Sequence, residues 1–298
     1  MNAANRYGWL VAIGVLLGAS LTACKEASDP IGDEKRIQND EEIKAYLSTN
    51  DISAQRTPEG LYYKVVSKGT STQKPVIGDE VRVTYIARRL DGVLVDSSEI
   101  SLNKPVRAVY GISKIPFLSD QAMSLLFEKP LLTEGDSAIL FLPSYLSYGA
   151  TGTLLFPAYT PVRLEMKVVS IRTEAEQIDD FVKDHSILIT ETTENGLRFG
   201  KTLSRPDSAE IKDGSVLQVK YTGRLMDYTV FDSGTLSVTV GSTSLVTGFT
   251  QGLLKMRAGE KANLLFPSTL GYGTQGSSPS IGPFAPLYFE VEIVSKTK

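Results

Sequence analysis

The sequence contains very few of the residues on which most enzyme centres depend. Its 298 residues include one cysteine and one histidine. One cysteine excludes an internal disulfide and any zinc or iron–sulfur site built from several thiolates. One histidine, His185, excludes most metal, catalytic-triad and general-base chemistry that uses imidazole, and we expect it to be solvated or to cap a helix. The sequence therefore predicts a function without a cysteine or histidine catalyst, and without a metal or other cofactor.

The chain also lacks an excess of positive charge. It has 31 Lys and Arg against 34 Asp and Glu, which leaves a net charge of −3. Nucleic-acid-binding proteins contact phosphates through a basic excess, so we expect no nucleic-acid partner. The contents of hydrophobic residues (42%) and charged residues (22%) are typical of a globular protein, and the length suffices for two domains.

Long hydrophobic runs are absent beyond the first residues of the chain. After the positive charge of Arg6, residues 9–19 are all apolar or glycine. Such a run is too short for an ordinary membrane-spanning helix and is typical of a signal peptide. It is followed by Leu-Thr-Ala-Cys at 21–24, which resembles the lipobox of bacterial lipoproteins. The alternative is an ordinary secretory signal followed by an incidental cysteine.

The lipobox resemblance implies a lipid-anchored protein. It implies removal of a signal peptide, residues 1–23, and acylation of Cys24, which would attach the chain to a lipid bilayer. The polar residues 24–38 would then form a tether. By analogy with the same lipoproteins, Lys25 in place of an aspartate after the cysteine indicates the outer membrane of a Gram-negative cell envelope, on its periplasmic face or at the surface.

The remainder of the sequence contains an ordered internal repeat. Short matches recur in the same order, 124 to 136 residues apart, as expected for a domain duplication with small insertions or deletions. The matched pairs include 81–85 with 217–221, Asp96 with Asp232, Gly111 with Gly241, and 148–149 with 272–273. The sequence therefore predicts two tandem domains, at 39–173 and 174–298.

Both copies have the same pattern of predicted elements. Each opens with a short amphipathic helical segment, at 41–47 and 174–184. Apolar and polar residues then alternate with period two, which predicts antiparallel strands with one face on a core. The clearest alternations lie at 81–85, 162–168, 217–221 and 287–293, and short helices are expected at 119–127 and 249–256. The predicted fold class is α+β, with each domain an antiparallel sheet around a short helix.

The second copy resembles the FK506-binding-protein (FKBP) family of peptidyl-prolyl cis–trans isomerases. The resemblance extends over 211–294, and the first copy matches the same framework more faintly. The segments that carry it are 219–225 (Val-Lys-Tyr-Thr-Gly-Arg-Leu), 231–233 (Phe-Asp-Ser), 246–249 (Val-Thr-Gly-Phe), 252–256, 259–262, Pro267, 272–273 (Tyr-Gly) and 287–292. It implies proline-containing polypeptide substrates and binding of FK506-like ligands. The layout of lipobox, tether and FKBP-like body is similar to envelope lipoprotein isomerases that assist the folding of exported proteins.

The family's chemistry is consistent with the scarcity of histidine and cysteine. A prolyl amide rotates slowly because twisting removes its resonance, at a barrier of roughly 18–20 kcal/mol. No bond is broken, so neither a nucleophile nor a metal is needed. A dry aromatic pocket disfavours the planar, charge-separated amide, and well-placed polar groups stabilise the twisted one. Catalysis of this kind is non-covalent and depends mainly on apolar residues.

The resemblance also implies which residues form the site. It implies a proline pocket of Tyr221, Phe231, Val246, Phe249, Ile281 and Phe289, with Leu245 at its rim. Asp232 and Tyr272 would be the polar catalytic groups that face the bound peptide. At Phe249 the family most often has tryptophan, and at Leu236 it usually has an aromatic wall, so we expect a shallower and more open pocket. The glycine-rich loop at 271–282 is expected to lie over it.

The first copy departs further from the family pattern. Val95 replaces the ring expected before the aspartate, and 115–131 shows no aromatic-floor motif. We therefore expect a degenerate scaffold or client-binding domain instead of a second isomerase. For the whole chain, one alternative is an FKBP-like chaperone or binding lipoprotein with little or no isomerase activity, and another is a purely structural envelope lipoprotein.

Overall fold

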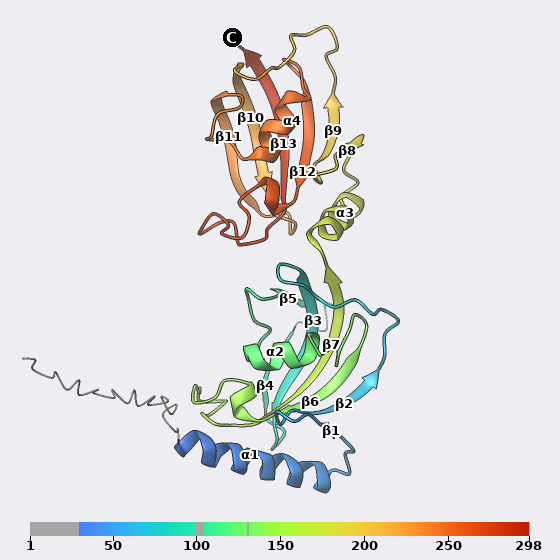
Figure 1. The fold of residues 1–298 in the computed structure, drawn as a ribbon, viewed down its shortest axis with the longest axis vertical. Helices are drawn as coiled ribbons and strands as arrows, with labels where there is room; N and C mark the ends of the chain where they lie inside the picture. Colours follow the sequence, from blue (N-terminus) through green and yellow to red (C-terminus); the bar gives the residue numbers. More distant parts are fainter. Residues whose placement is uncertain (1–29, 99–103, 130, 298) are drawn as a thin grey trace, which may run out of the picture.

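The described part of the chain folds into two antiparallel sheets, each with a short helix. The computed structural model describes residues 30–98, 104–129 and 131–297. The two sheets lie end to end along the long axis of the molecule and are joined where the chain leaves one and enters a helix (Figure 1). This arrangement confirms the predicted α+β fold class. The predicted signal peptide and Cys24 lie outside the described residues.

The first sheet contains seven strands. Its order is β1-β2-β6-β7-β3-β4, and β5 also pairs with β3. The elements are β1 (Gln55–Arg56), β2 (Tyr62–Ser67), β3 (Glu80–Arg89), β4 (Leu94–Ser97), β5 (Val106–Val109), α2 (Asp120–Phe127), β6 (Ser137–Leu142), the 3-10 turn η2 (Ser144–Leu146) and β7 (Val162–Arg172). Val81, Val83 and Tyr85 alternate into the core on β3, where buried residues of α2 cover them. The predicted strand periodicity is confirmed here.

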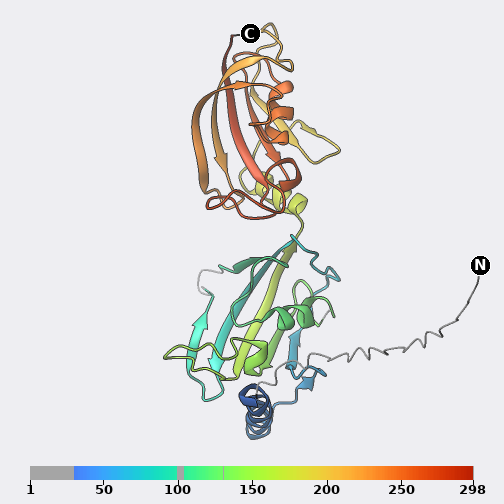
Figure 2. The ribbon, with the colours of Figure 1, turned by 60° about the vertical axis from the view of Figure 1, so that its left-hand side comes forward.

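The second sheet repeats this arrangement with six strands. Its order is β11-β10-β13-β12-β9-β8, which leaves β11 at one edge. The elements are β8 (Glu191–Thr192), β9 (Arg198–Leu203), β10 (Val216–Arg224), β11 (Val230–Thr239), α4 (Thr247–Leu254), β12 (Lys261–Phe266), the 3-10 turn η3 (Ser268–Leu270) and β13 (Leu287–Lys296). Figure 2 shows α4 on the concave side of this sheet. A sheet curved around one helix is thus present in both halves of the chain.

Helix α4 packs unusually close to the sheet because two of its residues are glycine. A Cβ on Gly248 would lie 2.5 Å from the ring of Phe266 on β12, and one on Gly252 would overlap the side chain of Leu264. The helix begins two residues before the predicted start at 249, since Val246 is already extended and the 247–249 backbone turns immediately into helix. Close contact with β12 places the other side of α4 toward β10 and β11.

The two remaining helices precede the two sheets. Helix α3 (Glu174–Asp184) has the predicted bounds, and a capping box between Thr173 and Glu176 fixes its start. Helix α1 (Pro30–Thr49) begins inside the segment that we assigned to a tether, so residues 30–38 of that segment are helical, and the helix predicted at 41–47 is longer than expected. Glu34, Lys35 and Arg36 are good helix formers, but the first turns have no apolar periodicity that would reveal the helix.

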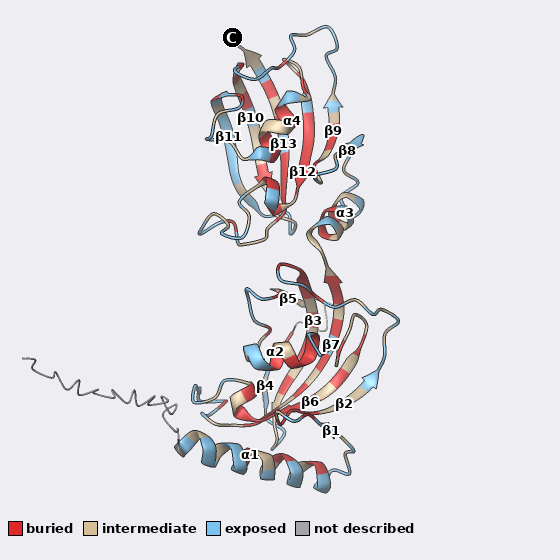
Figure 3. Cartoon of the chain, viewed as in Figure 1, coloured by how far each residue is buried: buried red, intermediate tan, exposed pale blue. Residues whose placement is uncertain are grey.

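The apolar contacts that anchor α1 to the first sheet lie in its second half, and Asn39 just before them is also buried. Ile43 and Leu47 are buried against Tyr62 and Phe141, whereas the earlier turns are largely exposed (Figure 3). Among residues 30–98, 104–129 and 131–297, none of the helices combines the length and the apolar character needed to cross a bilayer.

A single arginine ties the end of the first sheet to the start of the second half. Arg172, the last residue of β7, donates from Nη1 to Glu134 at 2.8 Å and from Nε to Asp180 of α3 at 3.0 Å. Gln73 reaches Glu176 of α3 at 3.4 Å. The two halves therefore meet through polar contacts around the α3 N-terminus and through the ring of Phe284, which lies against Gly78.

Candidate functional site

A cleft of about 270 Å³ opens on the second domain between α4, β10, β11 and β13. The structure brings eight of the nine predicted site residues together around it, with Ile281 the exception. The lining residues are Tyr221, Phe231, Asp232, Leu236, Ser237, Val238, Ser244, Leu245, Val246, Phe249, Tyr272 and Phe289. Strands contribute one side of the cleft and α4 with its preceding turn the other, while Tyr272 comes from the loop after η3.

Ile281 does not line the cleft, contrary to the expectation from the family pattern. Its side chain is buried in the core of the second domain. The reason is local: the backbone of Ile281 exchanges two hydrogen bonds with Ser277, at 2.7 and 2.9 Å, so the loop folds back on itself at this point. Of the predicted glycine-rich loop, Tyr272 is the residue that reaches the cleft.

The walls of the cleft are aromatic rings in edge-to-face contact. The Phe289 ring lies 5.1 Å from that of Phe249 and 5.5 Å from that of Phe231, with interplanar angles of 72° and 86°. These contacts depend on Gly223, because a Cβ there would lie 2.5 Å from Phe231 and 2.9 Å from Phe289. Edge-to-face packing holds the rings rigidly and leaves a hollow between them that a small apolar ring can fill.

A short hydrogen bond fixes the acidic group of the cleft. The Tyr221 hydroxyl donates to Oδ2 of Asp232 at 2.5 Å. Burial, together with this bond to a carboxylate, raises the pKa of Tyr221 to about 12, so the phenol stays protonated at neutral pH. The bond orients the Asp232 carboxylate at the mouth of the cleft and leaves its other oxygen available to a ligand.

Hydrogen-bond donors without protein partners surround the same opening. Val246 is the N-cap of α4 and has no side-chain oxygen, so no side chain caps the first amides of the helix. The Tyr272 hydroxyl has no hydrogen-bond partner among the described residues, and the side chain is 38% exposed. These donors can bind a peptide carbonyl that enters the cleft.

Some lining residues were not assigned from the sequence. Leu236 was noted only as a departure from the family, and Val238 two residues later points to the same side. Their alternation on β11 was a usable signal. Ser237 and Ser244 carry no such signal, because a lone serine in a strand or turn does not indicate a site.

The corresponding region of the first domain is filled by its own side chains. The Tyr85 hydroxyl donates to Asp96 at 2.6 Å, as in the second domain. However, Phe117 and Phe156 are both 3% exposed, and the Phe117 ring lies 5.1 Å from that of Tyr148 and 5.6 Å from that of Phe156. A Phe117–Tyr148–Phe156 cluster therefore packs where the second domain has an open cleft.

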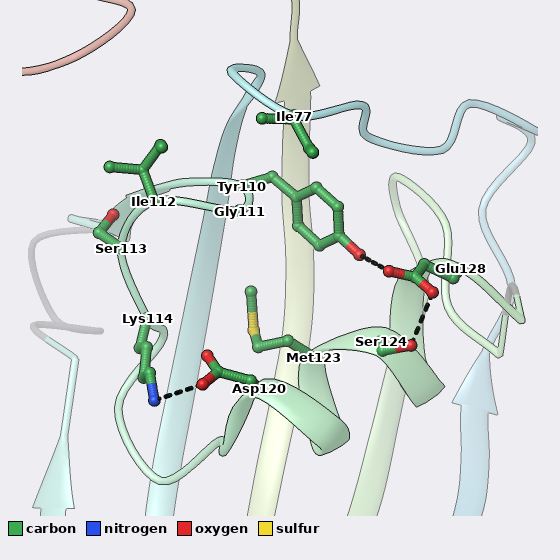
Figure 4. A pocket seen from close by; sticks show the side chains of 10 residues that line it. All are labelled: Ile77, Tyr110, Gly111, Ile112, Ser113, Lys114, Asp120, Met123, Ser124 and Glu128. Atoms are coloured by element: carbon green, nitrogen blue, oxygen red, sulfur yellow. Dashed lines mark hydrogen bonds and ion pairs between the residues drawn. The ribbon is translucent and has the colours of Figure 1, made fainter. Parts of the chain in front are cut away.

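The first domain has a different cavity, of about 260 Å³, on another side of α2 (Figure 4). It lies between α2 and the 110–114 turn, and Tyr85, Asp96 and Tyr148, which match Tyr221, Asp232 and Tyr272 of the second domain, do not line it. At its edge Glu128 accepts hydrogen bonds from Ser124 at 2.7 Å and from Tyr110 at 3.0 Å. The Ser124 bond and then the Tyr110 bond lower the pKa of Glu128, so the group is a stable carboxylate that caps the cavity.

The second domain therefore places a cleft with aromatic walls against one face of an antiparallel sheet. Comparison with known proteins identifies the family of this domain. The family model for "FKBP-type peptidyl-prolyl cis-trans isomerase" matches residues 207–294, which contain every residue of the cleft.

Relatives with similar sequences carry the same family name. The peptidyl-prolyl cis-trans isomerase FKBP2 of Bos taurus is 41% identical over 119 residues, which cover 37% of this chain and 84% of that protein. The probable FKBP-type peptidyl-prolyl cis-trans isomerase FkpA of Neisseria meningitidis is 32% identical over 135 residues, 44% of this chain and 49% of that protein. The crystal structure of FkpA from Escherichia coli is similar at 29% identity with a TM-score of 0.37, over 42% of this chain and 59% of that one. The chain belongs to the FKBP-type peptidyl-prolyl cis-trans isomerase family.

Proposed function

We propose that this isomerase works through the cleft of its second domain and assists the folding of exported, proline-containing polypeptides of the cell envelope. The observation that carries the proposal is the hollow between Phe231, Phe249 and Phe289, with unpartnered donors at its rim. A proline ring is small, apolar and close in size to such a hollow. The rings exclude water from the amide that precedes it.

The geometry suits catalysis by differential binding. Moving the planar amide from water into an apolar cleft costs more than moving the twisted amide, which has lost its charge separation. The free amides after Val246 and the Tyr272 hydroxyl can donate to a carbonyl of the bound peptide, and Asp232 lies across the opening from them. Interactions that strengthen as the amide twists lower the barrier, whereas those equal in both states only improve binding.

Turnover of a proline-containing peptide tests this proposal. Phe249→Ala removes the ring at the floor of the cleft, and we expect kcat/KM to fall by on the order of tenfold or more, since a cleft contact of this size contributes a few kcal/mol. Leu254→Ala is the matched control, because Leu254 lies on the same helix, is 43% exposed and does not line the cleft.

The comparison of the two variants decides the outcome. Thermal unfolding followed by circular dichroism checks that both retain the fold. A folded Phe249→Ala protein with undiminished turnover would contradict the assignment of the cleft. Turnover equally lost in both variants would do the same.

We also propose that the first domain is non-catalytic and that Cys24 carries a lipid in the outer membrane. The filled Phe117–Tyr148–Phe156 cluster supports the first statement, and the lipobox-like residues 21–24 support the second. Labelling of cells with a radioactive fatty acid tests the anchor: label should enter the wild-type chain and not the Cys24→Ser variant. Equal labelling, or none in either chain, would refute it.

A further inference from the structure

Strand β11 presents a long free edge beside the cleft. Among the described strands it pairs only with β10, in antiparallel register from Val216 opposite Thr239 to Arg224 opposite Val230. In such a pair every second residue directs its N–H and C=O away from the partner strand. The outer edge of β11 therefore carries a row of backbone donors and acceptors over ten residues.

This edge lacks several features that usually protect an edge strand, and the two that it has, a bulge at Phe231 and the carboxylate of Asp232, lie at one end of it. Protected edges are short, or carry lysine or proline. The sequence of β11 contains neither, and Asp232 is its one ionisable residue. The other sheet edges in the described residues are short, since β1 and β8 have two residues each and β4 and β5 have four each. Among the described residues, an outermost strand of this length occurs only beside the cleft, and its residues 233–239 carry no charge.

The edge and the cleft form one continuous surface. Phe231, Asp232, Leu236 and Val238 line the cleft from β11 itself. Between them Gly234 leaves open space, because a Cβ there would have no atom within 4 Å. A chain extended along the edge of β11 would pass beside the mouth of the cleft.

We propose that an extended segment of the substrate polypeptide adds to β11 as a further strand while its proline occupies the cleft. This inference rests on the proposed function and adds a recognition mode to it. Main-chain hydrogen bonds to an edge strand are independent of side-chain sequence. They suit an enzyme whose clients share a proline and little else. A second copy of this chain paired along β11 would leave the adjoining cleft without an occupant, which is why a client polypeptide is the favoured partner.

Peptide length tests the proposal with the full chain. The probes are a proline-containing tetrapeptide and a ten-residue peptide in which the same four residues are extended by alanine and threonine on both sides. Two or three added hydrogen bonds predict a kcat/KM roughly tenfold or more above that of the tetrapeptide. N-methylation of the extension should abolish this gain at alternate positions and leave it intact at the positions between them.

Variants of Thr235 provide the second arm. Thr235 is exposed on β11 and does not line the cleft. Thr235→Pro or Thr235→Lys should remove the gain from peptide length while tetrapeptide turnover stays at the wild-type level, and Thr235→Ser should change neither. The lysine variant keeps the test valid if the proline variant fails to fold.

Each other outcome is decisive. Equal kcat/KM for both peptides, or a gain in kcat/KM that does not depend on the positions methylated, would overturn the proposed pairing with β11. Turnover of the tetrapeptide would still support the proposed function. No tetrapeptide turnover would refute the proposed function, and titration of the ten-residue peptide and its methylated forms would still decide whether the edge binds it. A dimer in analytical ultracentrifugation that Thr235→Lys dissolves, without a length effect, would assign the edge to a second copy.

Discussion

The two domains share a frame and differ in what fills it. Both place a tyrosine hydroxyl on an aspartate, Tyr85 on Asp96 and Tyr221 on Asp232, at 2.6 and 2.5 Å. In the second domain the rings come from strands and helix, stand edge to face, and leave a hollow. In the first, Phe117 comes from a loop and packs into the corresponding space. The hollow thus depends on which elements supply the rings, and not on their number alone.

Helices α2 and α4 also differ, in whether a side chain caps their first amides. In the first domain Ser119 is the N-cap of α2, and its side chain accepts from the amide of Ala122 at 3.2 Å. In the second domain Val246 occupies the N-cap and leaves the amides free. The first helix satisfies its own donors, whereas the second keeps them available to a ligand. The filled space and the capped helix stabilise the first domain. The open cleft and the uncapped helix leave the second domain able to bind a ligand.

The largest expected effect comes from emptying the first domain. Phe117→Ala removes a buried ring, and we expect a loss of about 3 kcal/mol in the stability of that domain. Turnover should be unchanged, because the cleft of the other domain is intact. Urea unfolding with separate probes for each domain measures this, and reduced turnover at full folding would show that the domains are coupled.

Making the second domain more like the first should lower activity strongly. Phe289→Leu introduces the residue found at the matching position, Leu164. It removes ring contacts to Phe249 and Phe231, so kcat/KM should fall on the order of tenfold, with a loss of about 1 kcal/mol in stability. The reciprocal change, Leu164→Phe, is the control and should leave turnover unaltered. Full turnover by the Phe289→Leu variant would contradict a role of the Phe289 ring in catalysis.

A cap should affect activity more modestly. Val246→Ser supplies the oxygen that Ser119 supplies in the first domain, and it would occupy an amide of the first turn of α4. We expect kcat/KM to fall a few-fold, since a hydrogen bond contributes about 1 kcal/mol. Val246→Ala lacks the oxygen and separates this effect from the loss of the valine methyls. Equal activity of the serine and alanine variants would exclude a role for the free amides.

The smallest expected effect is a loss of stability at alkaline pH, when the Tyr221 phenol loses its proton. Its pKa is raised to about 12 by burial and by the bond to Asp232, so folding is favoured while the phenol is protonated. That contribution is complete below the unfolded value, about 10, and is lost as the pH rises toward 12. Absorbance titration of the tyrosinate should assign a late phase to Tyr221, and Asp232→Asn should move that phase to lower pH. An unmoved phase would contradict the coupling.

Much of the frame could be predicted because it has strong periodicity. The strands β3, β7, β10 and β13 follow from period-two patterning, and the bounds of α3 follow from apolar residues spaced three and four apart. The filling of the first domain could not be predicted, because Phe117 and Phe156 lie in loops where no period shows which way a ring points. Ile281 lies in a loop as well, and its side chain is buried in the core together with Phe249 and Phe289 instead of lining the cleft. The length of helix α1 was underestimated, because its first turns carry no apolar stripe that the sequence pattern could show.

Titration of the full chain with FK506 tests the contrast between the domains most directly. One open cleft predicts one equivalent bound per chain, with amide chemical-shift changes confined to residues around α4, β10, β11 and β13. Binding should be lost in Phe249→Ala and retained in Phe117→Ala. Two equivalents, none, or shifts centred on α2 of the first domain would contradict the account.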